Sequence, residues 1–207
     1  MDDEAQRLEA TKRYYDENAR AYAANVALAD LSDLWNAFAY LLPTGGVVLD
    51  VGCGGGRDLK ALTSRGLHAM GLDYSSAMAE VARVESDRPV VVGDLRSFDF
   101  GTGRFDGVWA VAALLHVPRH EIPGLLRRVY LGLRVPGVFL TSMQSGRGIE
   151  TSADGRLFEL YLPDQWQELL QCAGFHTRAG PIKLIPSRRA ALGQVSWFVT
   201  IGIKGEP

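Results

Sequence analysis

The stretch Val47-Val-Leu-Asp-Val-Gly-Cys-Gly-Gly-Gly56 decides the fold of this chain. Its first five residues form a short, β-branched apolar run, which is typical of a strand covered on both faces. Four glycines follow, and glycine tolerates positive φ and lets a ligand approach the backbone closely. The segment from Arg57 to Arg65 then has helical spacing and stops at Gly66. This order of strand, glycine turn and helix predicts a nucleotide-type binding corner.

The spacing of the glycines argues against a dinucleotide. A dinucleotide fingerprint requires a third glycine where this chain has Arg57. Asp50, at the end of the strand, would also repel a pyrophosphate. S-adenosylmethionine fits an acidic corner better because it carries a sulfonium, an ammonium group and a ribose, but no phosphate. A tight turn that binds nothing is the simple alternative for the glycine loop alone.

A second acid follows at a meaningful distance. The apolar segment His68–Asp73 is expected to be the next strand, and Asp73 lies 19 residues after Gly54. This is close to the interval of about 20 residues expected for an acid that accepts hydrogen bonds from ribose hydroxyls. Ser75 or Ser76 can then cap a helix over residues 77–84. An ordinary capping acid is the alternative interpretation of Asp73.

A third acid ends the next expected strand, residues 89–93. Asp94 can accept a hydrogen bond from an adenine amino group, while Leu95 and Met78 can cover the faces of the ring. The alternative is a surface turn acid with two core side chains, since methionine and leucine are usually core residues.

With these motifs the chain resembles the class I S-adenosylmethionine-dependent methyltransferases. Within them it is similar to a bacterial small-molecule branch, and the resemblance runs from about Tyr14 to Ile203. The motifs that carry it are Leu-Asp-Val-Gly-Cys-Gly-Gly-Gly-Arg-Asp, Gly-Leu-Asp-Tyr-Ser, Phe-Asp-Gly-Val-Trp-Ala and Leu-Leu-His-Val-Pro. The Asn/Asp-Pro-Pro-Tyr/Phe sequence of many base and glutamine methyltransferases is absent after the fourth strand, which argues against that chemistry.

The resemblance implies where each part of the methyl donor binds. Asp50 and Gly52 would face the methionine part, and Asp73 the ribose. Asp94 and Leu95 would face the adenine. The full expected cofactor-binding set is Tyr15, Tyr22, Asp50, Gly52, Gly54, Arg57, Asp73, Tyr74, Met78, Asp94, Leu95, Ala110 and Val111, with S-adenosyl-L-homocysteine as the product.

His116 is the candidate catalytic residue. It lies just past the fourth expected strand, Phe105–Val111, near where the methyl group should be. An imidazole titrates near neutral pH and can remove a proton from a hydroxyl or protonated nitrogen acceptor. A helix-capping or partly buried histidine is an equal alternative. An enzyme that methylates a thiolate or an aromatic nitrogen would need no base.

The acceptor site is less defined by the sequence. Residues 144–156 have the composition of a loop after the fifth strand. Arg147 or Arg156 could bind an anionic acceptor, although a plain surface arginine explains each of them as well. Trp197 could line the site or the core, and Trp166 is expected in the core.

Composition indicates one soluble domain. The chain has 207 residues, 47% of them hydrophobic, a net charge of −2 and a sequence pI of about 6.1, so no global basic field attracts nucleic acid. The acidic start has no apolar segment like that of a secretory signal, and the two cysteines favour reduced thiols. We expect a cytoplasmic monomer or homodimer with no metal, membrane or nucleic-acid partner.

The order of strands and helices predicts the fold class. We expect an α/β, Rossmann-like, doubly wound sheet of seven strands with helices on both faces, mostly parallel with an antiparallel last strand. Residues 1–43 would form an N-terminal helical lid and residues 44–207 the core of a single methyltransferase domain. Further expected helices are 4–18, 27–42, 119–133 and 163–173, and further expected strands are 137–143, 177–184 and 195–203.

The sequence therefore predicts methyl transfer to an O, N or S atom of a small-molecule acceptor, with natural products among the candidate acceptors. Three alternatives stay open: an RNA- or protein-directed methyltransferase, a non-catalytic module that binds S-adenosylmethionine, and an NAD-dependent oxidoreductase.

Overall fold

The sheet is built around β1 (Val47–Val51), the strand that begins the glycine motif. In the computed structural model, which describes residues 3–180 and 196–205, β1 lies between β2 (His68–Asp73) and β4 (Phe105–Val111) and is parallel to both. The described sheet has seven strands in the order β3-β2-β1-β4-β5-β9-β8. β9 (Trp197–Lys204) is inserted antiparallel between β5 and β8. The predicted fold class is confirmed.

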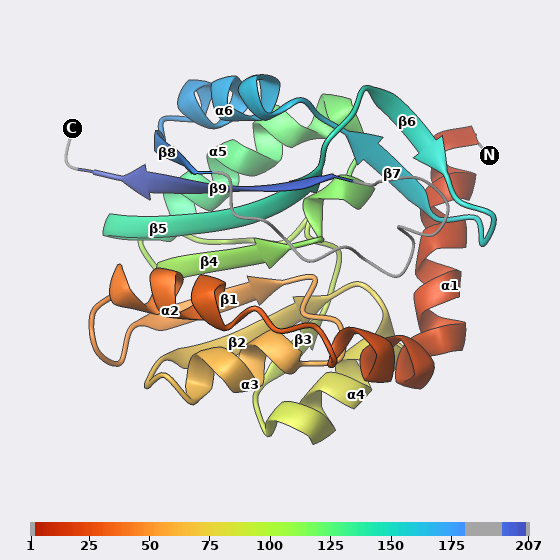
Figure 1. Cartoon of the computed structure of the whole chain (residues 1–207), viewed down its shortest axis with the longest axis horizontal. Coiled ribbons are helices and arrows are strands. Elements are labelled where there is room, and N and C mark those ends of the chain that lie inside the picture. Colours follow the sequence, from red (N-terminus) through yellow and green to blue (C-terminus); the bar gives the residue numbers. More distant parts are fainter. Residues whose placement is uncertain (1–2, 181–195, 206–207) are drawn as a thin grey trace.

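The other elements complete the α/β alternation shown in Figure 1. The helices are α1 (Asp3–Val26), α2 (Ser32–Tyr40), α3 (Arg57–Thr63), α4 (Ser76–Ser86), α5 (Ile122–Gly132) and α6 (Pro163–Cys172), with short 3-10 helices η1 (Leu114–His116) and η2 (Arg119–Glu121). The remaining strands are β3 (Val90–Val92), β5 (Leu133–Gln144), β6 (Gly148–Thr151), β7 (Leu157–Leu160) and β8 (His176–Gly180).

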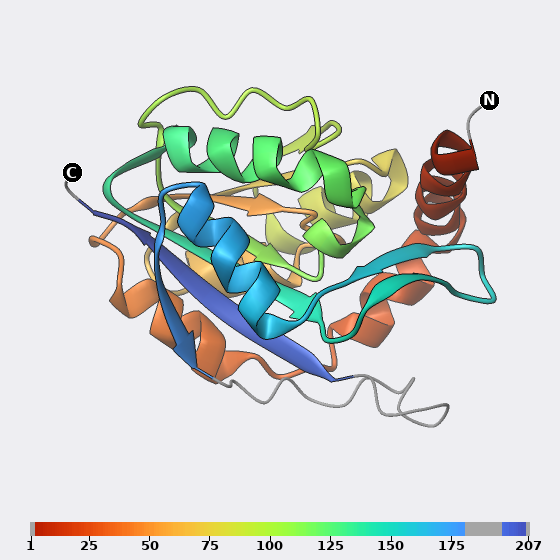
Figure 2. The ribbon, with the colours of Figure 1, turned by 90° about the horizontal axis from the view of Figure 1, so that it is seen from above.

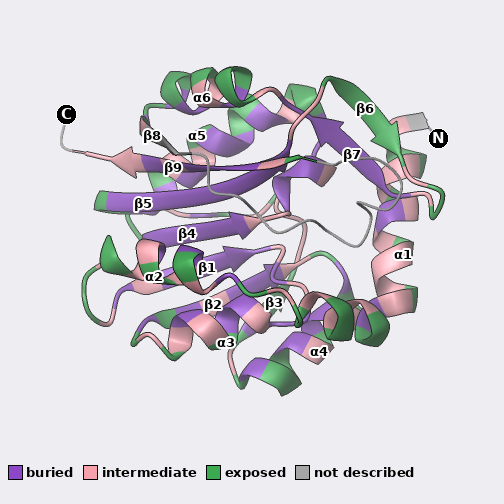
Figure 3. Ribbon diagram, in the orientation of Figure 1, coloured by how far each residue is buried: buried purple, intermediate pink, exposed green. Residues whose placement is uncertain are grey.

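Two hydrophobic clusters cover the two faces of the sheet. Along β1, Leu49 and Val51 belong to the cluster beneath α5 and α6, whereas Val48 belongs to the cluster beneath α2, α3 and α4. Successive side chains of a strand point to opposite faces, which explains this division. The central strands are accordingly buried, as Figure 3 shows. Trp166 is fully buried in the first cluster, as predicted.

The carboxyl ends of the parallel strands meet at one edge of the sheet, and two elements stand beyond this edge. These are α1 and the antiparallel hairpin of β6 and β7, which reaches towards α1 in Figure 2. The amide of Leu157 in β7 donates to Oγ1 of Thr11 in α1, at 3.0 Å. Tyr15 of α1 contacts His116, and His116 contacts Leu157 of β7, where these elements meet.

The N-terminal helices differ from their expected bounds. α1 continues to Val26 because its second half is rich in alanine, the strongest helix former. α2 begins only at Ser32, where Asp30 accepts hydrogen bonds from the amide and the hydroxyl of that serine. Such a side-chain turn competes with the helix that was expected to begin at Ala27.

The prediction of a loop over residues 144–156 is wrong, because β6 and part of its hairpin occupy it. All four residues of β6 are exposed and all four of β7 are buried, so neither strand shows the alternation that identifies a strand in a sequence. The strand expected at 137–143 is longer than predicted and spans all of β5. The helix expected at 119–133 divides into η2 and α5. Of the last two expected strands, residues 181–184 and 195 lie outside the described residues.

Candidate functional site

The glycine turn after β1 has the backbone geometry that the sequence predicts. Gly52, Gly54 and Gly56 have φ of +64°, +54° and +84°, values that favour glycine over any other residue. Gly55 is required for a different reason, since a Cβ there would lie 2.4 Å from the Cβ of Ala23 in α1. The turn therefore packs directly against the N-terminal helix.

Asp73, at the end of β2, braces this turn. Its Oδ2 accepts a hydrogen bond from the amide of Gly54 at 2.8 Å, and its Oδ1 accepts from the amide of Ser75 at 2.9 Å. Burial raises the pKa of Asp73 to about 6, although both amides act to lower it. Ser75 in turn accepts from the amide of Met78 and caps α4, as predicted. The ends of β1 and β2 are thus joined through one carboxylate.

Asp50 is the least satisfied acid of the site. Its side chain is 2% exposed, and its Oδ2 has no hydrogen-bond partner among the described residues. Burial raises the pKa of Asp50 well above its ordinary value, and the nearby carboxylate of Asp58 adds to the increase. A buried carboxylate without a partner is costly. A ligand that brings a positive charge to this corner would compensate it.

Asp94 lies in a different environment from the one expected. Its two carboxylate oxygens bind the guanidinium of Arg96 at 2.6–3.1 Å, and Arg96 also pairs with Glu121 at 3.2 Å. Leu95 is half-buried against the core, and the terminal methyl of Met78 lies 3.6 Å from where a Cβ on Gly54 would be. Asp94, which was predicted to accept from an adenine amino group, is therefore already paired with the guanidinium of Arg96.

The residues at the end of β4 pack against the glycine turn. Ala110 is fully buried and Val111 is half-buried. The next residue, Ala112, has a φ of +57°, which is uncommon for a residue other than glycine. Ala113 then packs on the glycine turn so closely that a Cβ on Gly52 would lie 2.6 Å from its own Cβ. The first and fourth strands therefore contact each other through small residues at this edge.

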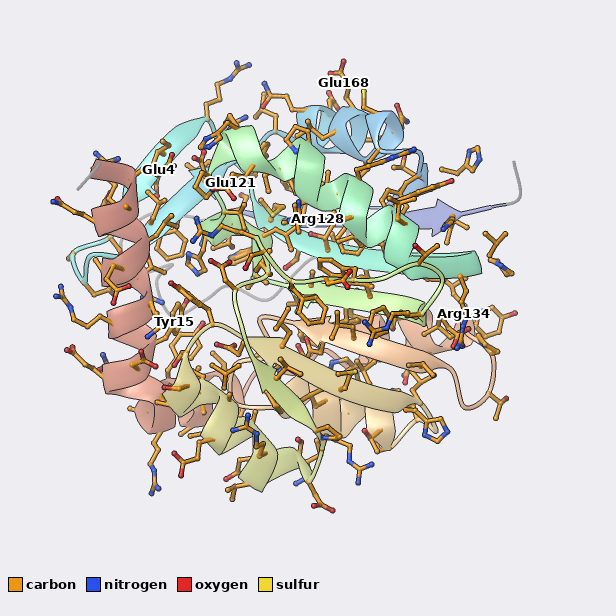
Figure 4. The ribbon with its side chains drawn as sticks, turned by 180° about the vertical axis from the view of Figure 1, so that it is seen from behind. Glu4, Tyr15, Glu121, Arg128, Arg134 and Glu168 are labelled. Carbon is orange, nitrogen blue, oxygen red and sulfur yellow. The ribbon has the colours of Figure 1, made fainter. Side chains whose placement is uncertain are left out.

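His116 lies between α1 and the hairpin. Its Nδ1 is 2.6 Å from the carbonyl oxygen of Leu157, and its Nε2 is 2.9 Å from the hydroxyl of Tyr15. A carbonyl only accepts, so Nδ1 carries the proton and Nε2 of the neutral ring is the basic nitrogen. Burial raises the pKa of Tyr15 well above its ordinary value, so its hydroxyl stays protonated and donates to Nε2. Tyr15 extends inward from α1 (Figure 4).

An aromatic cluster surrounds this pair and holds one buried cation. The guanidinium of Arg156 lies 4.0 Å from the ring centroid of Tyr14 and 5.5–5.8 Å from those of Tyr15, Tyr22 and Phe158. Asp154 binds it with both carboxylate oxygens, at 3.0 and 2.7 Å. Through these ring contacts Arg156 holds α1 and the hairpin together. Because Asp154 neutralises its charge, Arg156 has little charge left for an anionic acceptor.

Comparison with known proteins identifies the domain. A family model described as a methyltransferase domain matches residues 48–137, which include Asp50, Asp73 and His116. The structure of a Burkholderia thailandensis 1,6-didemethyltoxoflavin-N1-methyltransferase superimposes with a TM-score of 0.77, covering 100% of this chain and 92% of that chain at 20% identity. Residues 48–137 of this chain therefore match a methyltransferase domain, and the whole chain has the fold of an S-adenosylmethionine-dependent methyltransferase.

The curated relatives of this methyltransferase act on different acceptors. An 18S rRNA (guanine-N(7))-methyltransferase of Mus musculus is 30% identical over 181 residues, which are 81% of this chain and 59% of the mouse protein. A ubiquinone biosynthesis O-methyltransferase of Pseudomonas paraeruginosa is 36% identical over 107 residues, 48% of this chain and 45% of that protein. The matches span 31% to 59% of the length of the curated relatives. Sequence similarity therefore leaves the acceptor open.

The residues of this methyltransferase fit the donor that the family uses. The orphaned carboxylate oxygen of Asp50 suits a cationic methionine part, and the glycine turn leaves room for a close backbone contact. Asp73 has further lone pairs that can accept from ribose hydroxyls. The corner thus matches a cationic nucleoside better than a phosphate.

Several residues predicted for the site lie outside this corner. Tyr74 is 38% exposed, with the ammonium of Lys12 5.6 Å from its ring centroid. Arg57 turns away and donates to Asp58 and to the carbonyl of Val26. Arg147 is exposed in the bend between β5 and β6.

The structure also places Trp197 and a second histidine, His120. Trp197 is half-buried against the core cluster at the start of β9. His120, four residues after His116, is exposed and lies 3.7 Å from Glu4. Among the described residues, Glu4, His120 and Glu121 have potential ligand atoms within 4.8 Å of one another. Arg96 already pairs with Glu121, and this group is separate from the glycine corner.

A cavity of about 1060 Å³ lies between α1, α3 and α4. Its lining includes Ala23, Gly55 and Val81, so it follows the outer side of the glycine turn. Asp73, Asp94 and His116 do not line it. This cavity is therefore separate from those three residues.

Several residues have roles that depend on distant partners and that the sequence does not reveal. Asp58 accepts hydrogen bonds from the indoles of Trp35 and Trp109, both at 3.0 Å. Asp154 orders Arg156, and Ser142 binds the backbone of Ala112. Asp58 does have a signal in the sequence, because the Arg57-Asp58 pair follows the glycines. That pair indicates the start of α3, but it does not reveal that two indoles bind Asp58.

No helix among the described residues combines the length and the apolar character needed to cross a membrane.

Proposed function

We propose that this chain transfers the methyl group of S-adenosylmethionine to an O, N or S atom of a small-molecule acceptor. The observation that carries the proposal is the position of His116. Its basic Nε2 lies 2.9 Å from the Tyr15 hydroxyl, where α1 and the hairpin meet beyond the ends of the strands. The donor corner and a candidate base are thus on the same side of the sheet.

In this proposal each part of the donor has its own partners. Asp50 and Gly52 hold the methionine part, Asp73 accepts from the ribose hydroxyls, and Leu95 and Met78 cover the adenine. Asp94 would accept from the adenine amino group with a lone pair that Arg96 does not use. Gly54, the Ala110–Val111 backbone, and Tyr15 and Tyr22 of the lid complete the pocket.

Bound S-adenosylmethionine supplies a methyl carbon activated by positive sulfur, and the C–S bond breaks with its electron pair on sulfur as the acceptor atom attacks in line. The protein positions the acceptor and excludes water. Nε2 of His116 takes the acceptor proton as the new bond forms. The hydroxyl of Tyr15 must first leave Nε2, so α1 has to shift or Tyr15 has to turn when an acceptor enters. Arg147 and Trp197 remain proposed acceptor contacts.

A small acceptor is favoured over RNA by the charge of the chain. The net charge is −2, and the buried Arg156 is paired with Asp154, so this guanidinium offers little charge to a phosphate backbone. The similarity to the mouse rRNA methyltransferase keeps RNA as a second candidate. Binding to RNA that weakens steeply with salt would support this second candidate.

The proposal is tested by turnover on a panel of acceptors. The purified protein is incubated with S-adenosylmethionine and small phenols, amines, thiols and N-heterocycles, and products are sought by mass spectrometry as a gain of about 14 Da, the net gain when CH₃ replaces hydrogen. We expect at least one chemical class to gain this mass while S-adenosylhomocysteine accumulates. Tight donor binding with no product from any class would indicate a binding module, and methylation of RNA alone would identify the second candidate.

The assignment of Asp73 to the ribose predicts pH-dependent binding. Hydroxyl donors favour the ionised carboxylate, and the pKa of Asp73 in the free protein is about 6. The dissociation constant of S-adenosylhomocysteine should therefore fall about tenfold between pH 5 and pH 7. The effect of pH on folding stability has the opposite direction. The folded state holds the proton of Asp73 more tightly than the unfolded chain does, so the stability that this proton contributes is lost as the pH rises from 3.8 to about 6.

Calorimetry at pH 5, 6 and 7 measures this dependence, with Asp73→Asn as the matched variant. We expect weaker binding by this variant and no slope. An unchanged slope in Asp73→Asn would assign the titration to another group, with Asp50 the first to examine.

A further inference from the structure

The turn that follows β4 is strained at one residue. Ala112 is one of two non-glycine residues with positive φ among the described residues, the other being Asp87 at the exposed end of α4. Asp87 has the short polar side chain that tolerates this region, whereas alanine has no side-chain group to compensate it. Such strain persists only where the surroundings hold it.

A buried serine holds this turn. The amide of Ala112 donates to Oγ of Ser142 at 2.9 Å. Ser142 is fully buried on β5, directly opposite Val111 of β4 in the parallel pairing. β5 is an interior strand, paired with β4 on one side and β9 on the other, so the hydroxyl is fixed by the sheet and not by a loop.

The strained turn determines two positions at the site. Before it, Val111 leads the chain to the sheet edge. After it, Ala113 packs on Gly52 of the glycine turn and its carbonyl accepts from the amide of His116, at 3.2 Å. If Ala112 relaxed to negative φ, both Ala113 and η1 would move. The donor floor and the candidate base would then be displaced together.

We infer that Ser142 is a positioning residue that holds the Ala112 turn in its strained form and thereby sets both the floor of the donor pocket and the place of His116. This inference rests on the proposed function, because it assigns the consequence of the turn to donor binding and methyl transfer. The residue itself touches neither reactant.

The neighbouring threonine provides a matched control. Thr141 is fully buried one position earlier on β5, and its Oγ1 has no partner among the described residues. Thr141→Val removes a hydroxyl from the same strand without removing a hydrogen bond. Ser142→Ala removes a hydroxyl that has one.

A double-mutant cycle with Ala112→Gly tests the inference, since glycine adopts positive φ without strain. We expect Ser142→Ala to weaken S-adenosylhomocysteine binding about five- to tenfold, as for one lost hydrogen bond, and to lower kcat. In the Ala112→Gly background the same change should cost less than about twofold in affinity. Thr141→Val should bind as the wild type does.

Amide hydrogen exchange over residues 112–116 gives a readout that does not depend on activity. Exchange should become faster in Ser142→Ala and should be partly restored by the added Ala112→Gly. Equal losses of affinity in both backgrounds, or wild-type affinity in Ser142→Ala, would overturn the inference. A wild-type protein that binds no S-adenosylhomocysteine would instead overturn the proposed function on which it rests.

Discussion

Replacing His116 with asparagine should lower kcat for a hydroxyl or amine acceptor by about 10²- to 10⁴-fold, the usual contribution of a general base. Asparagine can place an amide N–H where Nδ1 of His116 donates to the carbonyl of Leu157, which keeps the contact with β7. It offers no basic nitrogen at the Nε2 position. The loss should therefore fall on the chemical step, with donor affinity within about twofold of the wild type.

Single-turnover kinetics and calorimetry measure these two quantities separately. His120→Asn is the control, because His120 is exposed on η2 and lies outside the aromatic cluster; its turnover should match the wild type. Wild-type turnover in His116→Asn would rule out His116 as the base. That result would favour an acceptor that needs none, such as a thiolate or an aromatic nitrogen.

Tyr15→Phe tests whether the Tyr15 hydroxyl blocks His116 or supports its action as a base. The Tyr15 hydroxyl lies 2.9 Å from Nε2 of His116. If it must leave before an acceptor enters, its removal should leave kcat unchanged or raise it. If it passes the proton on, kcat should fall as it does in His116→Asn.

Replacing Asp58 with alanine should destabilise the fold by about 3–5 kcal/mol, the cost of removing one partner of a buried ion pair. Its carboxylate accepts from Nε1 of Trp35, Nε1 of Trp109 and the guanidinium of Arg57, all at 2.7–3.0 Å. Without it, two indole N–H groups and a half-buried guanidinium lose their acceptor. The effect exceeds that of a surface ion pair because the side chain of Asp58 is only 10% exposed.

Urea denaturation followed by tryptophan fluorescence measures the loss, with an unchanged m-value as the sign that only stability has changed. Glu168→Ala is the control: Glu168 is exposed on α6 (Figure 4), and its replacement should change the free energy of unfolding by less than about 0.5 kcal/mol. A loss below about 1 kcal/mol in Asp58→Ala would show that water replaces the carboxylate.

The strand ends were predictable because each is a local event. The apolar run before Gly52, and the acids at Asp73 and Asp94, occupy positions that depend only on where one strand stops. Parallel strands bring such positions to one edge, so three local signals predicted a common site. The hairpin of β6 and β7 was missed since one of its strands is wholly exposed and the other wholly buried.

The partners of the site residues were not predictable in the same way. His116 meets Tyr15 from 101 residues away and Leu157 from 41. Asp94 is paired with Arg96. Of the two arginines considered for the acceptor, Arg147 is exposed and Arg156 is buried among four aromatic rings. No periodicity or spacing encodes these pairings, because they depend on how α1 and the hairpin pack.

The sequence by itself determined the fold class, the glycine corner and the three acids that follow the strands. These features arise from strand burial and from the φ values open to glycine, which act within a few residues. Only the tertiary structure decided which nitrogen of His116 is basic, which arginine is compensated, and which serine holds the turn after β4. Those properties depend on hydrogen bonds between distant segments, and such bonds exist only once the chain has packed.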